Sequence, residues 1–338
     1  MKTIQDLENK LAQPSADLIR DIAAIDGDIM LLGVGGKMGP SLARLAMNAI
    51  KEAGVQKKVI GASRFSSGDV KQELEAAGVE TISVDLLDDA QLQSLPDVKN
   101  VIYMAGNKFG TTGNEHFTWA MNAYLPGRVA EKYKDSRIVV FSTGNVYPMT
   151  PIAYGGVSEE DPTGSNGEYG QSCLGRERVF EYFSHKHGTP LVIYRLNYAI
   201  DMRYGVLLEM AKQVKAGKPI DVTMGSLNCI WQGDANEIAI RALNVCSNPP
   251  KVLNVSGPET ISLRWLATMF GQRFGVDVSF VGEESPTAYI SNSAKAHQLF
   301  GYPSVSLLQM IDWTAEWLNA GGHVWNKPTH FQEREGKY

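Results

Sequence analysis

Residues 28–39 read DIMLLGVGGKMG, and this stretch decides the fold that we expect for the chain. DIMLLGV predicts a short apolar strand, and the glycines after it follow the pattern G-x-x-G-x-x-G, at Gly33, Gly36 and Gly39. PSLARLAMNAIKEAG then predicts a helix that ends at Gly54. A strand, a glycine-rich turn and a helix in this order direct backbone N–H groups and the positive end of a helix dipole to one place, which suits a pyrophosphate.

The context of this glycine loop predicts a dinucleotide site, with a glycine-rich turn without ligand as the alternative. The residues that we assign to the loop site are Gly33, Gly35, Gly36, Lys37, Met38 and Gly39. The next predicted strand, KKVIGAS, is followed by Arg64 after Ser63, with no carboxylate before Asp69. An acidic residue is usual there in NAD sites, whereas an arginine accommodates the 2′-phosphate of NADP. We therefore expect NADP, with NAD as the alternative; Arg64 is otherwise a solvated surface residue.

Short strands rich in Val and Ile alternate with helical runs along residues 29–197, including NVIYMAG (100–106) and RIVVFST (137–143). Both faces of these strands are apolar, as a parallel sheet covered by helices requires. The pattern predicts an α/β fold, a doubly wound (Rossmann) parallel sheet with helices on both faces. We divide the chain into three parts, of which residues 29–197 form the dinucleotide-binding domain and residues 1–28 an N-terminal helical extension. Residues 198–338 form mainly a small C-terminal substrate-binding lobe, with segments that return to the sheet.

The composition is ordinary for a globular protein and argues against several classes of function. The chain has 338 residues and a net charge of -5, so no overall positive field favours nucleic acid. Its three cysteines, Cys173, Cys229 and Cys246, suit neither a disulfide framework nor a zinc site, and we expect no metal. The N-terminus lacks the apolar core of a signal peptide, and no apolar run would span a bilayer. We expect a cytoplasmic protein without a membrane partner.

Four further segments carry a resemblance to a known family. They are VDLLD (84–88), MAG (104–106), VVFSTGNVYP (139–148) and EYGQSCLGRE (168–177). With the glycine loop, they resemble the extended short-chain dehydrogenase/reductases, which include nucleotide-sugar epimerases and dehydratases, from Gly33 to about Trp317. The resemblance implies that the cofactor is bordered by Asp85, Leu86, Ala105 and Gly106. It also implies a homodimer built on helices at 117–134 and 169–187.

The catalytic pattern of that family is Y-x-x-x-K-x-x-x-E, and this chain keeps its tyrosine and its glutamate, Glu177. The resemblance implies that Tyr169 is the acid/base and that Thr143 orients the reacting oxygen. Cys173 replaces the lysine, which in the family lowers the pKa of the tyrosine. Cys173 is either a small apolar residue that fills the space or a reactive thiol near the nicotinamide. Lys108, after the fourth strand, is our candidate for the missing charge, with a solvated loop lysine as the alternative.

Other departures from the family concern the substrate. Gly144 and Asn145 stand where its dehydratases have Asp-Glu, so lyase chemistry by that mechanism is not expected. Arg176 lies nearly two helical turns beyond Tyr169, and we do not expect it to contribute to the site. The family's Gly-Pro after the sixth strand is replaced by AIDMRYG (199–205), which weakens the expectation of a nucleotide-sugar pocket. The residues that we assign to the substrate are Asn107, Asn145, Asn197, Arg203 and Trp231. For Arg203 and Trp231 the alternative is packing between the lobes.

Together these observations predict an NAD(P)-dependent oxidoreductase or epimerase that acts on a small sugar-like or hydroxy-carbonyl substrate. The loss of the lysine keeps two alternatives open. One is a non-catalytic cofactor-binding or sensor protein of the same fold, and the other is a non-redox isomerase or lyase in which Cys173 takes part. The retained Tyr169 and Thr143 favour the enzyme.

Overall fold

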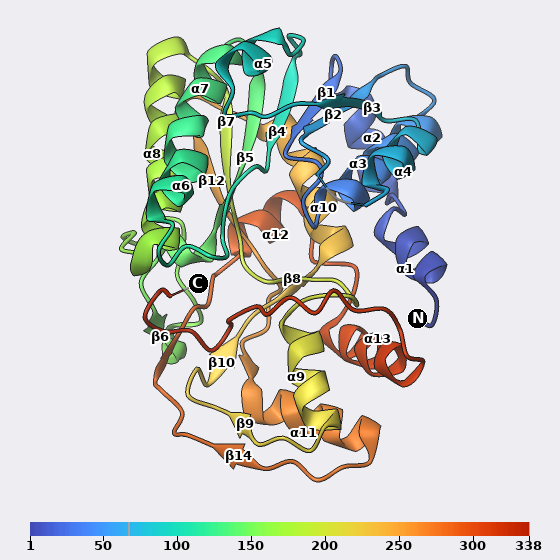
Figure 1. Ribbon diagram of the computed structural model, residues 1–338, viewed down its shortest axis with the longest axis vertical. Helices are drawn as coiled ribbons and strands as arrows, with labels where there is room; N and C mark the ends of the chain where they lie inside the picture. Colours follow the sequence, from blue (N-terminus) through green and yellow to red (C-terminus); the bar gives the residue numbers. More distant parts are fainter. Residues whose placement is uncertain (67, 338) are drawn as a thin grey trace.

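A computed structural model of the protein describes residues 1–66 and 68–337. Its centre is a seven-stranded parallel sheet with the order β12-β7-β5-β4-β1-β2-β3 (Figure 1). The strands are β1 (Ile29–Leu32), β2 (Val59–Ser63), β3 (Glu80–Ser83), β4 (Asn100–Tyr103), β5 (Arg137–Thr143), β7 (Leu191–Leu196) and β12 (Lys251–Val255). From β1 the strands follow chain order toward one edge of the sheet, and from β4 they follow it toward the opposite edge. The carboxyl ends of the strands form a crevice where the order changes direction, at the β1–β4 pair. The expected doubly wound fold is confirmed.

Helices cover both faces of the sheet, because alternate residues of each strand point to opposite sides. Ile29 and Leu31 share one core with α3 (Gly39–Ala53), α4 (Val70–Ala76), α10 (Gln232–Arg241) and α12 (Ala294–Phe300). Met30 and Leu32 share the other core with α5 (Asp89–Ser94), α7 (Leu125–Lys132) and α8 (Gly167–His187). Every residue of β1 is therefore buried, which explains why its sequence is continuously apolar.

The helix expected around residues 117–134 is interrupted, as its proline indicates. A π-helical turn at Ala120–Tyr124 separates α6 (Glu115–Trp119) from α7, in which Pro126 occupies the first turn. Proline has no N–H to donate to the preceding turn, so a wider turn is tolerated there. The turn directs the buried side chain of Asn122 inward, where its Nδ2 donates to the carbonyl oxygen of Asn107 at 2.8 Å. Turns of this kind are frequent at functional sites.

The small lobe has a core of its own below the sheet (Figure 1). Its helices are α9 (Val206–Lys215), α11 (Leu263–Phe274) and α13 (Leu307–Asn319). Short strand pairs surround them: β9 (Ile220–Asp221) with β14 (Phe280–Val281), β10 (Ser226–Leu227) with β13 (Ile261–Ser262), β8 (Ala199–Ile200) with β11 (Ile230–Trp231), and β6 (Thr150–Pro151) with β15 (Thr287–Ala288). β12 follows the first segments of this lobe in the sequence, yet it pairs with β7 in the main sheet.

The N-terminal extension contacts both halves of the molecule. α1 (Ile4–Leu11) inserts Leu7 and Leu11 into the core of the small lobe. α2 (Ala16–Ala24) begins after Ser15, whose hydroxyl accepts the N–H of Leu18 at 3.0 Å. Leu18 and Ile22 are buried in the core of the sheet. Residues 1–28 therefore contribute apolar side chains to both cores.

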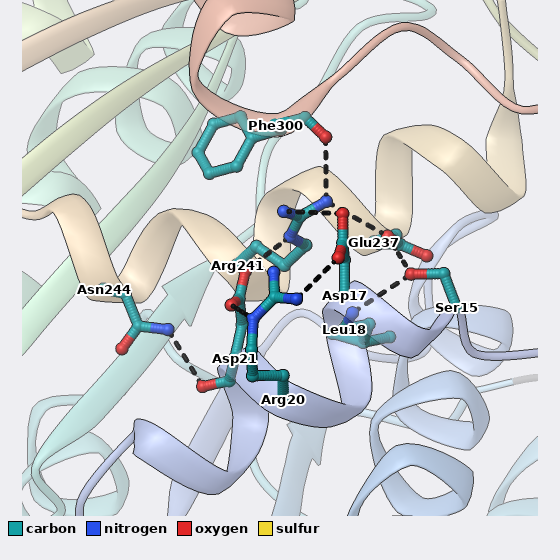
Figure 2. Close-up of polar contacts among 9 residues, drawn as sticks. All are labelled: Ser15, Asp17, Leu18, Arg20, Asp21, Glu237, Arg241, Asn244 and Phe300. Carbon is teal, nitrogen blue, oxygen red and sulfur yellow. Dashed lines mark hydrogen bonds and ion pairs between the residues drawn. The ribbon is translucent and has the colours of Figure 1, made fainter.

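An ion-pair network fastens α2 to α10, as Figure 2 shows. Arg241 is almost fully buried, and its Nε donates to Asp21 at 2.7 Å. Its Nη1 donates to the carbonyl oxygen of Phe300 at 2.9 Å and to Glu237 at 3.3 Å. Glu237 also accepts the hydroxyl of Ser15 at 2.6 Å. One guanidinium therefore joins the extension, α10 and the end of α12.

The segment after α13 runs back across the molecule, and we call residues 323–337 the C-terminal strap. Figure 1 shows it in dark red, passing from α13 toward the start of α8. Phe331 is 1% exposed in the core of the small lobe, and Arg334 donates to the carbonyl oxygen of Thr287 at 2.9 Å. A Cβ added to Gly167 would lie 2.1 Å from the carbonyl oxygen of Gly336, so backbone packs on backbone there. The strap thus reaches the first residue of α8.

None of the helices in residues 1–66 and 68–337 is both long enough and apolar enough to cross a membrane. Across the same two ranges, no group of three or more His, Cys, Asp or Glu side chains is placed to hold a metal ion. Cys173, Cys229 and Cys246 carry free thiols.

Candidate active site

A cavity of about 450 Å³ lies at the carboxyl ends of the central strands. Tyr169 from α8, Thr143 from β5 and Lys108 from the loop after β4 line it together with the glycine loop. The other lining residues include the aromatic and amide side chains of Phe109, Phe141, Tyr198, Tyr204, Asn107, Asn145, Asn197 and Gln232. Residues distant in sequence meet here because parallel strands bring their carboxyl ends to one edge of the sheet.

Tyr169 lies in the first turn of α8, half-buried against a small cluster that contains Val146, Tyr147 and Cys173. The Nζ atom of Lys108 is 5.5 Å from the centroid of the Tyr169 ring. Burial lowers the pKa of Lys108 to about 8, against the opposing effect of Cys173. The structure therefore places the candidate cation beside the phenol and inside the cavity.

Thr143 ends β5, and Asn145 fixes its side chain. The Thr143 hydroxyl donates to Oδ1 of Asn145 at 3.0 Å and accepts the Asn145 N–H at 3.2 Å. Its neighbour Ser142 donates to Glu177 at 2.5 Å, and Glu177 forms a buried ion pair with Arg195 at 2.6 Å. Glu177, the retained third residue of the motif, thus anchors α8 to β5 and β7 behind the cavity.

Cys173 is fully buried next to Tyr169. Burial raises the pKa of the Cys173 thiol, although the charge of Arg176 opposes this shift. A buried thiol with a raised pKa is protonated at neutral pH and is a weak nucleophile. This environment favours the interpretation of Cys173 as a small residue that fills space.

The structure differs from our expectation at Arg176, whose side chain turns inward beside Cys173. Its Nη1 donates to the carbonyl oxygen of Phe141 at 2.7 Å, and its Nη2 donates to Oδ1 of Asn122 at 2.8 Å. A Cβ on Gly106 would lie only 2.5 Å from Nη2, so this glycine leaves room for the guanidinium. The rise of the helix separates the backbone of Arg176 from that of Tyr169, but the long side chain of Arg176 spans that distance. A buried positive charge therefore lies next to the position where the family has lysine.

The glycine loop has the form that a dinucleotide requires. Gly33 has a φ of +91°, and a Cβ there would lie 2.7 Å from the backbone nitrogen of Ala105. A Cβ on Gly39 would lie 2.1 Å from the carbonyl oxygen of Val34. The N-cap residue of α3, Met38, makes no side-chain hydrogen bond to the helix, which leaves the first N–H groups of α3 for a phosphate. These features fit the pyrophosphate of NAD or NADP.

A groove of about 240 Å³ continues from the loop, and it shares Gly33, Gly36 and Gly106 with the cavity. The residues predicted to border the cofactor meet in it: Ser63, Arg64, Asp85, Leu86 and Ala105. Arg64 is exposed at its rim. A Cβ on Gly35 would lie 2.6 Å from the Ser63 hydroxyl oxygen, so this glycine keeps the second strand close to the loop.

Comparison with known proteins agrees with this geometry. Residues 29–254 match the NAD dependent epimerase/dehydratase family. The protein belongs to that family. A search of curated proteins finds no match to this epimerase/dehydratase family member.

Solved structures with the same fold include sugar-nucleotide enzymes. UDP-glucuronic acid 4-epimerase from Bacillus cereus in complex with NAD is 19% identical with a TM-score of 0.68, over 86% of this chain and 98% of that chain. UDP-glucose 4-epimerase from Thermotoga maritima with UDP-glucose is 16% identical with a TM-score of 0.69, over 87% and 99%. dTDP-glucose 4,6-dehydratase from Bacillus anthracis in complex with NAD is 16% identical with a TM-score of 0.72, over 87% and 96%. These likenesses establish the fold.

Two residues assigned to the substrate lie outside the cavity of this epimerase/dehydratase family member. Trp231 is 1% exposed and packs edge-on against Trp313, with 5.4 Å between ring centroids. Arg203 pairs with the buried Asp201 at 2.6 Å and lies 4.7 Å from the centroid of the Trp325 ring. Trp231 lies in β11 and Arg203 follows β8, and the pairing of these two strands places both residues in the small lobe.

The three predicted asparagines do line the cavity, and hydrogen bonds hold the side chains of all three. Asn107 donates to the hydroxyl of Thr118 at 3.1 Å. Asn197 donates to Oδ1 of Asn228 at 2.7 Å. These amides therefore position the loops around the cavity. Asn145 positions Thr143 in the same way.

Sequence reasoning missed several residues that line the cavity, among them Phe109, Tyr204 and Thr329, and one residue behind it, Asn122. Asn122, which holds Arg176, lies in the interrupted helix, and the break signal at Pro126 was the only sequence cue to it. Thr329 of the C-terminal strap lines the cavity. Apolar residues of the strap do not recur at the spacing of a strand or a helix, so its sequence does not predict that it crosses the site.

Proposed function

We propose that the protein is an NAD(P)-dependent oxidoreductase or epimerase that acts on a small sugar-like substrate or a hydroxy-carbonyl compound. The observation that carries this proposal is the shared cavity: Tyr169, Thr143 and the glycine loop line one space. Family membership and the sugar-nucleotide enzymes among its structural neighbours support it.

Tyr169 is the acid/base of this proposal. A phenol has an ordinary pKa near 10, so it needs positive charge nearby to act as a base at neutral pH. Lys108, 5.5 Å from the ring, and Arg176, buried behind Cys173, supply that charge in place of the family's lysine. Thr143, fixed by Asn145, orients the reacting oxygen of the substrate.

The cofactor of this proposal is NADP, with NAD as the alternative. The loop from Gly33 to Gly39 would hold the pyrophosphate, and Arg64 would contact the 2′-phosphate. When bound, a nicotinamide supplies hydride transfer to or from the substrate carbon. Complexes of two structural neighbours contain NAD, so the choice of NADP depends on Arg64 alone.

Replacing the phenol tests the proposal. Tyr169→Phe should lower turnover by about 10²–10⁴-fold in a screen of sugars and hydroxy-carbonyl compounds, followed by nicotinamide absorbance for oxidoreduction and by chromatography of the products for epimerisation. Its affinity for the cofactor should stay close to that of the unmodified protein. Tyr182→Phe, on the exposed face of the same helix, is the matched control and should keep full activity.

Two results would redirect the assignment. Cofactor binding without turnover of any compound would favour the non-catalytic sensor, which the loss of the lysine also suggests. Turnover that thiol alkylation of Cys173 abolishes while the cofactor stays bound would favour the non-redox isomerase or lyase. The burial of Cys173 argues against the latter.

A further inference from the structure

A carboxylate on the N-terminal extension connects the two parts of the molecule. Glu8 of α1 forms ion pairs with Arg44 of α3 and with Arg203, which follows β8 in the small lobe. The side chain of Glu8 is 13% exposed, and those of Arg44 and Arg203 are 24% and 11% exposed. Removing one partner of a buried ion pair leaves the other charge uncompensated. A change at Glu8 would therefore affect one arginine in each part of the molecule.

The two arginines repel each other, and Glu8 lies between them. Burial lowers the pKa of Arg44; the negative charge of Glu73 opposes this shift, and the positive charge of Arg203 adds to it. Arg203 also pairs with the buried carboxylate of Asp201 at 2.6 Å, so it keeps one counter-charge when Glu8 is neutral. Glu8 thus draws together two positive groups that belong to different parts of the fold.

The position of Arg203 determines the position of Tyr204. The backbone N–H of Arg203 donates to Oδ1 of Asp201 at 2.8 Å, and its Nη2 donates to Oδ2 of the same carboxylate at 2.6 Å. Two backbone hydrogen bonds between Asp201 and Tyr204, at 3.1 and 3.2 Å, close the turn that contains these residues. The turn therefore moves as one unit, and the Tyr204 ring that it carries lines the cavity.

The same turn contacts the glycine loop inside the cavity. Nζ of Lys37, just before α3, lies 3.4 Å from the centroid of the Tyr204 ring. α3 and the turn therefore meet twice, in the cavity through this contact and outside it through Glu8. If Glu8 lost its charge, repulsion between Arg44 and Arg203 would push the turn away from α3. The Tyr204 ring would then move away from the glycine loop.

α1 itself is fixed to both parts of the molecule, and Figure 1 shows it beside α3 and the small lobe. Leu7 and Leu11, on either side of Glu8 in the sequence, are buried in the core of the small lobe. Nδ2 of Asn48, on α3, donates to the carbonyl oxygen of Ala12 directly after α1 at 2.8 Å. The backbone of Glu8 therefore has a defined place between the two arginines.

We propose that Glu8 is a positioning residue of the active site, which holds the side of the cavity that contains Tyr204 against the glycine loop. This inference rests on the proposed function, because it concerns the substrate side of that cavity. Glu8 is not one of the described residues that line the cavity, so it acts through Arg203 and Tyr204. Tyr169 and Thr143 belong to α8 and β5 and stay in place when the turn moves.

Glu8→Gln removes the charge and keeps the shape of the side chain. With the compound that shows the highest turnover in the screen of sugars and hydroxy-carbonyl compounds, it should raise KM about tenfold and change kcat less than about twofold. A displaced side of the cavity weakens the binding of the substrate and of the transition state alike, so the effect appears in KM. An unchanged KM, or a loss in kcat alone, overturns the proposal.

Asn48→Ala is the matched control, because it removes a link between α1 and α3 that does not involve Arg203. It should leave KM and kcat unchanged. An equal rise of KM in Asn48→Ala and in Glu8→Gln would show that any loosening of α1 has this effect, and it would overturn the role of the Glu8 charge.

The repulsion between the arginines allows a rescue experiment. Arg44→Met, added to Glu8→Gln, removes one of the two positive charges and should return KM to within about threefold of the unmodified value. If Glu8 contributed only to the stability of the fold, the second substitution would remove further contacts and recover nothing. A KM that stays high or rises further in the double variant overturns the proposal.

Backbone amide exchange of the full chain, measured by mass spectrometry without substrate, gives a readout that does not depend on turnover. In Glu8→Gln, exchange should become about tenfold faster in the peptide that contains residues 201–206 and stay unchanged in β1 and β5. Unchanged exchange in that peptide, or equally faster exchange over the whole chain, overturns the proposal. If no compound is turned over, the proposed function fails, and this measurement still decides whether Glu8 holds the turn.

Discussion

At the scale of single residues, Arg64 is the side chain on which the choice of cofactor depends. It lies exposed at the rim of the groove that also contains Ser63 and Asp85. A guanidinium binds a phosphate through a fork of two N–H groups, and it has no comparable partner on a free ribose hydroxyl. Arg64→Ala should therefore weaken NADP binding by about tenfold or more and leave NAD binding nearly unchanged, as measured by calorimetry.

The control for this prediction is Arg178→Ala, which removes an exposed arginine that pairs with Glu181 on the outside of α8. Arg178→Ala should change neither the affinity for NADP nor the affinity for NAD. Equal losses for NADP and NAD in Arg64→Ala would show that Arg64 does not read the 2′-phosphate, and NAD would then be the better assignment.

Another residue-scale prediction concerns position 173. The effect of a lysine there depends on Arg176, because the two side chains are neighbours. Cys173→Lys would place an ammonium in a fully buried position beside a guanidinium. Burial and repulsion between like charges should lower the free energy of unfolding by about 3 kcal/mol or more, because the nearby carboxylate of Glu177 is already paired with Arg195. Urea denaturation and cofactor affinity measure the loss.

Two further variants separate charge from volume at this position. Cys173→Met adds length without charge and should cost about 1–3 kcal/mol through overpacking. The double variant Cys173→Lys with Arg176→Ala removes the repulsion and makes space, so it should recover part of the lost stability. A stable Cys173→Lys protein with tight cofactor binding and higher turnover would show instead that only the family's lysine was missing.

At the scale of elements, the attachment of α2 to α10 depends on one arginine (Figure 2). Arg241→Met would leave Glu237 without its counter-charge, Asp21 with the exposed Arg20 alone, and the carbonyl oxygen of Phe300 without its donor. Because the guanidinium is almost fully buried, we expect the free energy of unfolding to fall by about 3 kcal/mol in urea denaturation.

Helix α2 offers a matched control for this prediction. Arg20 pairs with Asp17 in the same cluster, but its side chain is 66% exposed. Arg20→Met should therefore cost no more than about 1 kcal/mol. If the two variants lost equally little, the network would contribute little and the apolar contacts of Leu18 and Ile22 would hold α2 in place.

The elements also show what a sequence can and cannot predict. β1, the glycine loop and α3 follow from local signals, because a buried parallel strand is apolar throughout and Gly33 and Gly39 have no room for a Cβ. The packing of α1 could not be predicted, because the lobe that receives Leu7 and Leu11 begins almost 200 residues later. The inward turn of Arg176 was missed because its partners, Phe141 and Asn122, lie on other elements.

At the scale of the whole molecule, exposed aromatic residues mark the surface on which we expect a homodimer. Tyr124 at the start of α7 is 58% exposed and Tyr182 on α8 is 60% exposed, and both lie in the helices whose resemblance implies a dimer. Large exposed apolar side chains at adjoining helices are typical of an interface. Tyr182→Glu should convert a dimer into a monomer in sedimentation velocity.

Tyr302→Glu is the control, because Tyr302 is 76% exposed and lies outside those helices. It should leave the oligomeric state unchanged. A protein that sediments as a monomer before any substitution would contradict the expected dimer directly.

The path of the C-terminal strap has a consequence for how the protein is made. The glycine loop is synthesised early, whereas Thr329, which faces the same cavity, leaves the ribosome near the end of the described chain. A partly synthesised chain would therefore present a cofactor loop before the wall that restricts the substrate exists. Early cofactor capture would stabilise the sheet while the ribosome is still at work. Selection among substrates would begin only once the strap has reached α8.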